Sequence, residues 1–520
     1  MPFLQLQTWQ QPLPIDALAN VPVVLLQRLA NNAHRDSFQR ALAARAVTPT
    51  LISLTALPHI LLAGYLAVPH SPRRLARWPV LAAIWALCAY QILCMSTANV
   101  SFAYCIGVGA MNMGLRAWHL LVGLDVHEEA MRVVRRKRGT PRACAGLADD
   151  RDDAGNGTAA AAAAAAVNGA ARQRKPSEHG REVTKEHELN GSQDVDGFDR
   201  FRCSGWNIAI STLPKPDTTN IKSGDVVDMK SASLVSRSGC KRFLSPRAFI
   251  RNRVVKIVVV YLIVDIFGNA MSRDPLFVLG SELFPYYKGG LPFPLDVSPP
   301  LVRTLLRRSC AAVGVWGMLE CYSASLELVV YFLLETFFPS KGGVWQFSTL
   351  FGSFEHVLDR GLPGAWGSFW HQSFRMSFLA PVAYLIKKGY LKKGSAATQM
   401  LAAFSAFLLS GLFHAAGSVS STGLTQPWRP MVFFMLQFFG ILLQKAVTSV
   451  AGKLFAAREP PSRSRTFMRR SFNLLFVTAW LWMTSDIFID DLATAGVWLC
   501  EPLPFSFVKL LGFGPSGWAI

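Results

Sequence analysis

Apolar residues along the chain gather into long runs separated by polar and basic stretches. A hydrocarbon core of about 30 Å needs roughly 20 consecutive apolar residues in a helix, and runs of about that length recur along the chain. The predicted spans are 50–68, 78–96, 99–123, 254–272, 309–334, 396–417, 430–450 and 471–490, with 497–514 as a further candidate. The pattern therefore predicts an all-α multipass transmembrane bundle of about eight to nine helices.

One apolar segment is too short to cross a bilayer. Residues 376–386, MSFLAPVAYLI, contain a proline and lie between two stretches that we expect on the cytosolic side. Backbone that enters a membrane without crossing it is tolerated only where protein or a water-filled cavity covers it. We therefore expect a re-entrant or interfacial segment beside an internal tunnel.

A break in composition falls at 128–198. This stretch includes the basic run RVVRRKRG and eight consecutive alanines at 159–166, and it has few apolar residues to offset the entropy of ordering. It is predicted to be a disordered, low-complexity cytosolic insert. It separates an N-terminal region with about three spans, 1–127, from a core at 199–495 and a hydrophobic tail at 496–520.

Composition and charge support a membrane protein. Hydrophobic residues make up 51% of the chain and charged residues 17%, whereas soluble domains carry roughly 25% charged residues. The net charge is +20, yet the Lys and Arg residues lie between the apolar runs, which favours membrane topology and contact with lipid headgroups over nucleic-acid binding. The stretches predicted to face the cytosol are 71–77, 132–138, 387–393 and 458–470.

The N-terminal region fits this orientation less well. Its first residues lack a basic start before the apolar part, so no cleavable signal peptide is predicted. The basic region 28–45 would be lumenal, as would Arg303, Arg307 and Arg308. An interfacial helix, or a span hidden near 15–30, would explain either of these conflicts.

Two histidines are the candidates for chemistry. His414 lies in a predicted span, FLLSGLFHAAG, where an ionisable group is costly to bury without a partner. Ser410 is one helical turn earlier on the same face and is placed to orient the ring. His371 lies in GAWGSFWHQSFR at 364–375. The alternatives are a histidine bonded to a neighbouring helix for His414 and an aromatic belt at the membrane surface for His371.

Other polar residues in the spans are interpreted as structural. The charged residues in this group are Arg116, Asp265, Glu320, Glu327 and Asp486. We expect them to pair with neighbouring helices. The nine cysteines show no spacing typical of a metal site or a disulfide framework, so no metal is predicted.

Four motifs, in the expected order, resemble the wax-synthase-like branch of the membrane-bound O-acyltransferases. AWGSFWHQ at 365–372 is similar to that branch's FWGxxWHQ motif, and SGLFH at 410–414 is similar to its SGLxH segment. FRCSGWN at 201–207 resembles RGIGWN of fungal members, and WQFSTLFGSF at 345–354 resembles WPPLFGS. The resemblance covers roughly 200–490.

The resemblance implies transfer of an acyl group from acyl-CoA, the co-substrate, to a hydroxyl group. It gives His414 the role of catalytic base and His371 that of orienting the thioester or stabilising its carbonyl. Residues near them would bind the substrates or line the tunnel, and these are Trp366, Phe369, Trp370, Gln372, Arg375 and Ser410. No bound cofactor is expected, and the membrane is expected to be the endoplasmic reticulum.

The chain departs from the family pattern near the donor site. Ala365 stands where Phe is usual, and Ser368 stands where Arg is common, so a donor-phosphate contact cannot be carried over to position 368. Arg375, Lys387 and Lys388 are nearby basic substitutes or, alternatively, membrane anchors.

The motifs do not fix the acyl donor or the hydroxyl-bearing acceptor. The insert and the SGWN segment resemble fungal members, which favours acetyl transfer to a hydrophobic secondary metabolite such as a terpenoid. The alternatives are a long-chain wax ester synthase, a scaffold without activity, and a multipass transporter, for which no internal repeat is visible.

Overall fold

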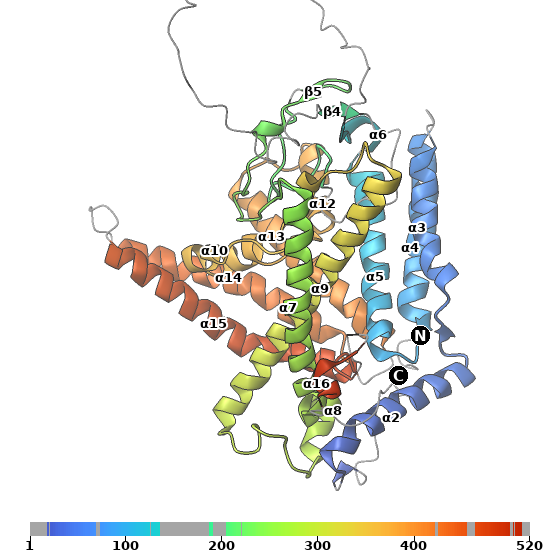
Figure 1. Cartoon of the computed structure of the whole chain (residues 1–520), viewed down its shortest axis with the longest axis vertical. Helices are drawn as coiled ribbons and strands as arrows, with labels where there is room; N and C mark the ends of the chain where they lie inside the picture. Colours follow the sequence, from blue (N-terminus) through green and yellow to red (C-terminus); the bar gives the residue numbers. More distant parts are fainter. Residues whose placement is uncertain are drawn as a thin grey trace, which may run out of the picture.

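The computed structural model is a helical bundle crossed by one helix at its lower end (Figure 1). The residues it describes are 18–19, 21–68, 73–124, 126–135, 187–190, 204–219, 221–421, 425–454, 463–499, 503 and 505–511. The helices before the insert are α2 (Val23–Ala43), α3 (Ile52–Ala67), α4 (Arg73–Cys94), α5 (Val100–Trp118), the π-helix η3 (His119–Gly123) and α6 (Val126–Glu129).

The remaining helices form the core and the C-terminal end. They are η6 (Met229–Ser231), α7 (Pro246–Arg273), α8 (Pro275–Leu283), η7 (Phe284–Tyr286), α9 (Pro300–Phe337), η8 (Val344–Gln346), α10 (Glu355–Arg360), α11 (Leu362–Gly364), the π-helix η9 (Ala365–Phe369), α12 (Arg375–Lys387), α13 (Ala396–Ser420), α14 (Trp428–Leu454), α15 (Arg463–Thr494) and α16 (Phe507–Leu510).

The predicted membrane character is confirmed. Among the described residues, 6 helices are long and apolar enough to cross a membrane, and they lie in α4, α7, α9, α13, α14 and α15. The predicted spans 50–68 and 99–123 correspond to α3, an apolar helix of 16 residues, and to α5 with η3. The prediction of a span at 497–514 is wrong, since the described residues of that stretch contain only the four-residue helix α16.

Strands are short and lie outside the bundle core. Strands β1 (Thr48–Pro49) and β2 (Met95–Ser96) pair in parallel, and β3 (Arg132–Arg135), β4 (His187–Asn190) and β5 (Val226–Val227) form an antiparallel sheet. Two segments of the insert predicted to be disordered, 132–135 and 187–190, instead form strands β3 and β4, which pair with each other. Its poly-alanine tract lies outside the described residues.

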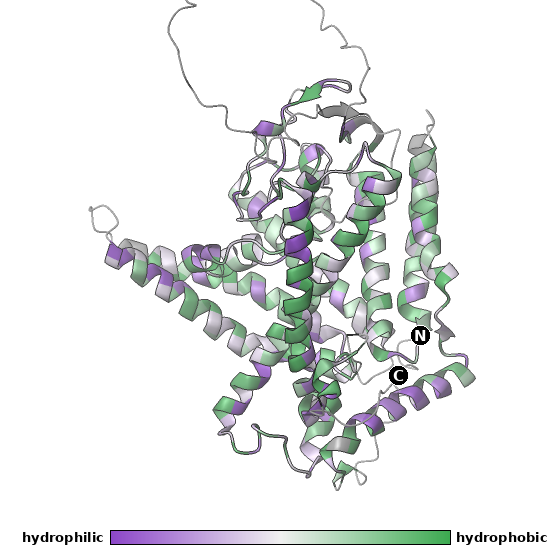
Figure 2. Cartoon of the chain, in the orientation of Figure 1, coloured by the Kyte–Doolittle hydropathy of each residue, from purple (hydrophilic) through white to green (hydrophobic). Residues whose placement is uncertain are grey.

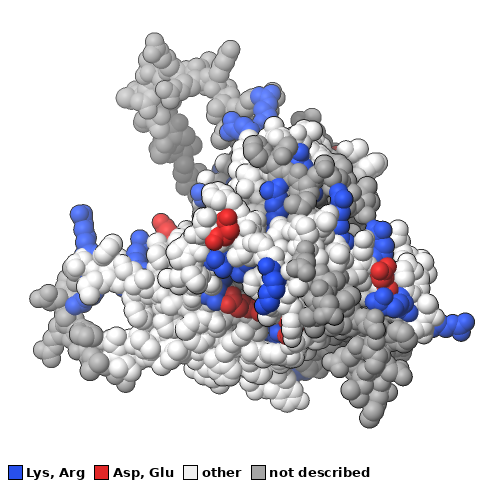
Figure 3. Space-filling view, turned by 90° about the horizontal axis from the view of Figure 1, so that it is seen from below, with Lys and Arg blue, Asp and Glu red and all other residues white. Residues whose placement is uncertain are grey.

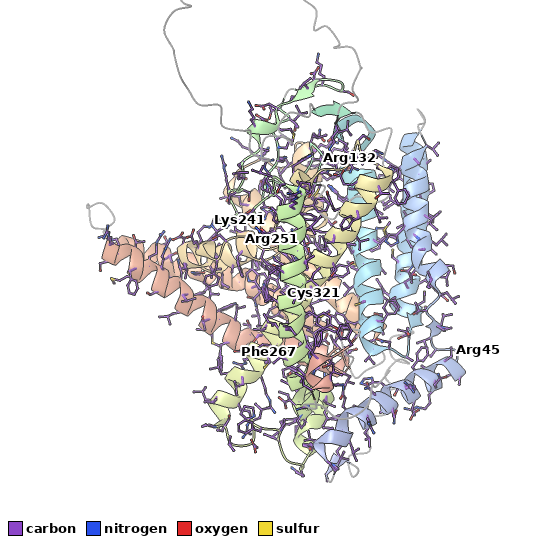
Figure 4. All side chains as sticks on the ribbon, viewed as in Figure 1. Arg45, Arg132, Lys241, Arg251, Phe267 and Cys321 are labelled. Atoms are coloured by element: carbon purple, nitrogen blue, oxygen red, sulfur yellow. The ribbon has the colours of Figure 1, made fainter. Side chains whose placement is uncertain are left out.

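The distribution of polar residues marks the two ends of the bundle. Apolar residues cover the middle of α7 and α9, whereas polar ones gather at the upper end of α7 and along α2 (Figure 2). Arg132, Lys241 and Arg251 lie in the upper half of the view, and Arg45 lies lower, at the right-hand end of α2 (Figure 4). Helix α2 runs crosswise to the bundle, as an interfacial helix would, so no hidden span is needed at 15–30.

Three of the five charged residues that were expected to pair with neighbouring helices form ion pairs, and Asp265 instead accepts from the backbone amide of Val508 at 3.0 Å. Glu327 accepts from Arg253 at 2.8 Å and Glu320 from Lys256 at 2.9 Å, both between α7 and α9. Arg308 on α9 pairs with Asp486 on α15. The view from below also shows basic and acidic side chains next to one another (Figure 3). These carboxylates hold helices together and offer no support for a charged transport path.

Helix α12 has the length expected for a segment that does not cross the membrane. Its 13 residues span about 20 Å, less than a hydrocarbon core. It packs against α13, which is also covered by α4, α5 and α14. Helix α13 is therefore the central element of the bundle, and residues on it meet side chains from several others.

Helices α5 and α13 approach closely at a glycine. A Cβ at Gly107 would lie 2.0 Å from the carbonyl oxygen of Ala416 and 2.5 Å from the hydroxyl oxygen of Ser420. The same Ser420 hydroxyl accepts from the Gly107 amide at 3.1 Å and donates to the Ala103 carbonyl at 2.7 Å. Position 107 therefore has no room for a side chain.

Gly107→Ala is expected to lower the free energy of unfolding by about 1–3 kcal/mol, the usual cost of overpacking. Thermal unfolding of the detergent-solubilised protein measures this. Gly109→Ala is the matched control, because a Cβ at Gly109 meets nothing within 4 Å. Equal unfolding midpoints for the two variants would contradict the close approach.

Candidate active site

The segment just before His371 is a widened helical turn. It follows Gly361, whose φ of 64° and closeness to Gln444 suit glycine alone, and it continues as the π-helix η9. Gln444 fixes the start of the turn by accepting from the amide of Leu362 at 2.8 Å. Single π-helical turns are rare, and they are found frequently at functional sites.

Gln372 closes this turn. Its side chain is 8% exposed, and its amide nitrogen donates to the carbonyls of Trp366 at 2.9 Å and Trp370 at 2.7 Å. Its amide oxygen accepts from Arg375 at 2.7 Å, and Arg375 also donates to the Gly367 carbonyl at 3.3 Å. Both side chains therefore hold the shape of the segment, a structural role that the sequence did not indicate.

Position 368 has a basic neighbour after all. The hydroxyl of Ser368, which is 7% exposed, accepts from a guanidinium nitrogen of Arg360 at 2.6 Å. Arg360 ends α10, eight positions earlier in the chain. The sequence pattern missed this residue, because only the turn at Gly361 brings α10 back against the π-helix.

His371 lies among aromatic rings. Its ring centroid is 5.4 Å from that of Trp370, 5.8 Å from that of Phe374 and 6.1 Å from that of Phe351. Phe369 faces another way, towards Phe351 and Phe354.

His414 lies on α13 with aromatic rings on three sides. The ring of Phe434 is stacked at 5.0 Å with an interplanar angle of 8°, and the rings of Phe413 and Phe488 stand edge-on at 5.1 and 4.9 Å. The Nδ1 atom of His414 is 3.3 Å from the hydroxyl oxygen of Tyr104 on α5. The hydroxyl group at the ring is therefore that of Tyr104, where the sequence suggested Ser410.

The two histidines belong to one aromatic cluster. The ring of Phe374 is 5.8 Å from that of His371 and 4.7 Å from that of Phe413, which is 5.1 Å from His414. The imidazoles are also close enough to interact electrostatically. The sequence had placed them at different depths, and the fold brings them together.

Trp366 and Trp370 form a second aromatic connection. Trp370 contacts His371 at 5.4 Å and Trp366 at 6.0 Å, and Trp366 contacts Phe434, the ring stacked on His414, at 6.2 Å. Apolar walls of this kind exclude water from a reacting centre. Among the described residues, no group of three or more His, Cys, Asp or Glu side chains is placed to hold a metal ion.

Residues 345–436, which include both histidines, match the Membrane bound O-acyl transferase family. The chain resembles this family over less than a fifth of its length. The four motifs found in the sequence had indicated the same assignment, and three of them fall within the matched residues.

Curated proteins similar to this chain carry related names. The chain is 29% identical over 180 residues to acetyltransferase aurG of Calcarisporium arbuscula, which covers 34% of this chain and 41% of that protein. It is 26% identical over 185 residues to acetyltransferase atnC of an Arthrinium species, covering 34% and 40%. The chain thus matches about two fifths of the length of these relatives. No solved structure matches it significantly.

Proposed function

We propose that this acyltransferase moves an acyl group, preferentially acetyl, from coenzyme A to a hydroxyl of a hydrophobic acceptor. The observation that carries the proposal is the joining of His371 and His414 by the ring of Phe374 and that of Phe413 within the family-matched residues. The preference for acetyl is supported by the names of the fungal relatives.

In this reaction the neutral imidazole of His414 is the general base. It takes the proton of the acceptor hydroxyl while the oxygen attacks the thioester carbonyl, so a C–O bond forms. The C–S bond then breaks, and the imidazolium returns the proton to the thiolate of coenzyme A. General base catalysis of this kind contributes about 10²- to 10⁴-fold.

His371 is assigned to the thioester side of the same centre. A ring N–H directed at the carbonyl oxygen stabilises the negative charge that develops there, and such a donor is worth most where water is excluded. Trp366 and Trp370, which connect the surroundings of the two rings, would form the apolar wall. Phe369, Gln372, Arg375 and Ser410 are proposed to shape or line the substrate path.

The core is proposed at 199–495, and the enzyme is proposed to reside in the endoplasmic reticulum. Acetyl-CoA is the proposed donor, and the acceptor class is a terpenoid or another secondary metabolite. A wax ester synthase using long-chain donors is the second candidate, and it is favoured only by the wax-synthase-like motifs, because fold alone does not fix substrate.

Competition between donors tests the proposal. Membranes containing the protein are incubated with equal concentrations of acetyl-CoA and palmitoyl-CoA and a panel of terpenoid and fatty alcohols. Acetyl esters are expected to exceed palmitoyl esters by about tenfold or more, a difference of about 1.4 kcal/mol in transition-state binding. Mass spectrometry of the products measures the ratio.

The controls are membranes without the protein and membranes with the His414→Ala variant. Dominant palmitoyl esters would replace the acetyl proposal with the wax ester alternative. The absence of any ester with either donor, from correctly inserted protein, would contradict acyl transfer to these alcohols.

A further inference from the structure

The residue that contacts the proposed base has no part in the scheme above. The hydroxyl oxygen of Tyr104 lies 3.3 Å from Nδ1 of His414, and the Tyr104 side chain is 7% exposed. Its ring packs so closely on α13 that a Cβ at Gly417 would come within 2.9 Å of it. The phenol is therefore held in place at the imidazole.

A buried carboxylate lies close enough to this phenol to act on it electrostatically. Asp491 on α15 is 0% exposed, and its Oδ1 atom accepts from the Ser418 hydroxyl at 2.9 Å and from the Gln426 amide at 3.1 Å. Its Oδ2 atom is buried and has no hydrogen-bond partner among the described residues. Tyr104 packs against the adjacent residue Leu492, and the carboxylate acts electrostatically on the phenol.

The position of the single N–H of the imidazole decides whether the phenol donates or accepts the hydrogen bond. A neutral imidazole has one N–H and one nitrogen with a lone pair. If the phenol donated to Nδ1, the ring hydrogen would be on Nε2, and neither nitrogen would be free to take a proton. If Nδ1–H donates to the phenol oxygen, Nε2 keeps its lone pair.

The charge of Asp491 favours the second arrangement. A negative charge attracts the phenol hydrogen, and this turns the lone pairs of the oxygen away from the carboxylate and towards the ring. The same charge stabilises the imidazolium that forms during the reaction, as a carboxylate does behind a catalytic histidine.

We propose that Tyr104 is a positioning residue for His414, whose Nδ1–H donates to the phenol oxygen so that Nε2 is the basic atom. This inference rests on the proposed function, in which His414 is the base. Tyr104 keeps its own proton throughout, and the proton taken from the acceptor leaves with coenzyme A.

Tyr104→Phe is expected to lower kcat by about 10- to 100-fold, the size of losing one hydrogen bond to a group that becomes charged. The KM values for donor and acceptor and the unfolding midpoint should stay at wild-type values, because the ring and its packing remain. Asp491→Asn should also lower kcat, since it keeps an acceptor at Oδ1 and removes the charge.

Tyr261→Phe is the matched control. Tyr261 on α7 donates its hydroxyl to the carbonyl of Phe505 at 2.5 Å, away from the two histidines, so its removal should leave kcat unchanged. A wild-type kcat for Tyr104→Phe, with His414→Ala inactive, would overturn the positioning role alone. The positioning role would also be overturned if KM and the unfolding midpoint of Tyr104→Phe changed together with kcat, because that pattern indicates a structural defect. Full activity of His414→Ala would overturn both proposals.

Discussion

His414→Ala is expected to reduce acyl transfer by about 1,000-fold or more, the upper part of the range for losing a general base. The variant removes the only group that the proposed scheme uses to accept the hydroxyl proton. The alanine methyl group is smaller than the imidazole that stacks on Phe434, and it offers no atom that could accept a proton. Initial rates of ester formation at saturating donor and acceptor measure the loss, with protein content measured in the same membranes.

His59→Ala is the matched control for that experiment. His59 is also carried by an apolar helix, α3, and its Nδ1 atom is 3.3 Å from the carbonyl of Thr55 on the same helix. It has no role in the proposed site, so its replacement should leave the rate unchanged. A rate for His414→Ala within a factor of two of wild type would remove His414 from the mechanism.

Glu327→Ala is expected to lower the free energy of unfolding by about 3–5 kcal/mol, the usual cost of leaving one member of a buried ion pair without its partner. The charge left without its partner is that of Arg253, which is buried in the bundle with 2% exposure. Arg253 also donates to the Ser348 carbonyl at 3.1 Å, close to the start of the active-site segment. Denaturant unfolding in detergent measures the loss.

Replacing both partners distinguishes the effect of the buried charge on stability from the effect of the lost contact. The double variant Arg253→Met with Glu327→Leu should recover most of the stability, because no uncompensated charge remains. Asp359→Ala, which removes a solvent-facing partner of Arg469 and Arg470, should cause little change. The interpretation would be wrong if Glu327→Ala and Asp359→Ala had the same unfolding midpoint.

The helices were predictable because their cause is local. The spans were predicted from runs of apolar residues of bilayer length. Six of these eight predicted spans lie in helices that are long and apolar enough to cross a membrane, and the other two lie in shorter or less apolar helices. The failed prediction at 497–514 has an equally local reason. Proline at 502 and 504 and glycine at 512 and 514 interrupt that run, and a helix interior tolerates neither well.

The small sheet across the insert was not predictable from composition. Strands β3 and β4 are four residues each and lie more than fifty positions apart, so no window of sequence contains both partners. Pairing of distant strands is decided by the fold that brings their ends together. The same is true of Arg360 and Ser368, which meet only because Gly361 turns the chain.

For the site, the sequence singled out the residues that are proposed to carry chemistry, and the tertiary structure decided how they meet. His371 and His414 were identifiable as candidates because burying an imidazole among apolar residues without a partner costs free energy. That they belong to one aromatic cluster depends on the packing of α12, α13 and α14. The contact between Tyr104 and His414 depends on glycines that let α5 and α13 approach, and sequence spacing cannot encode a distance between two helices.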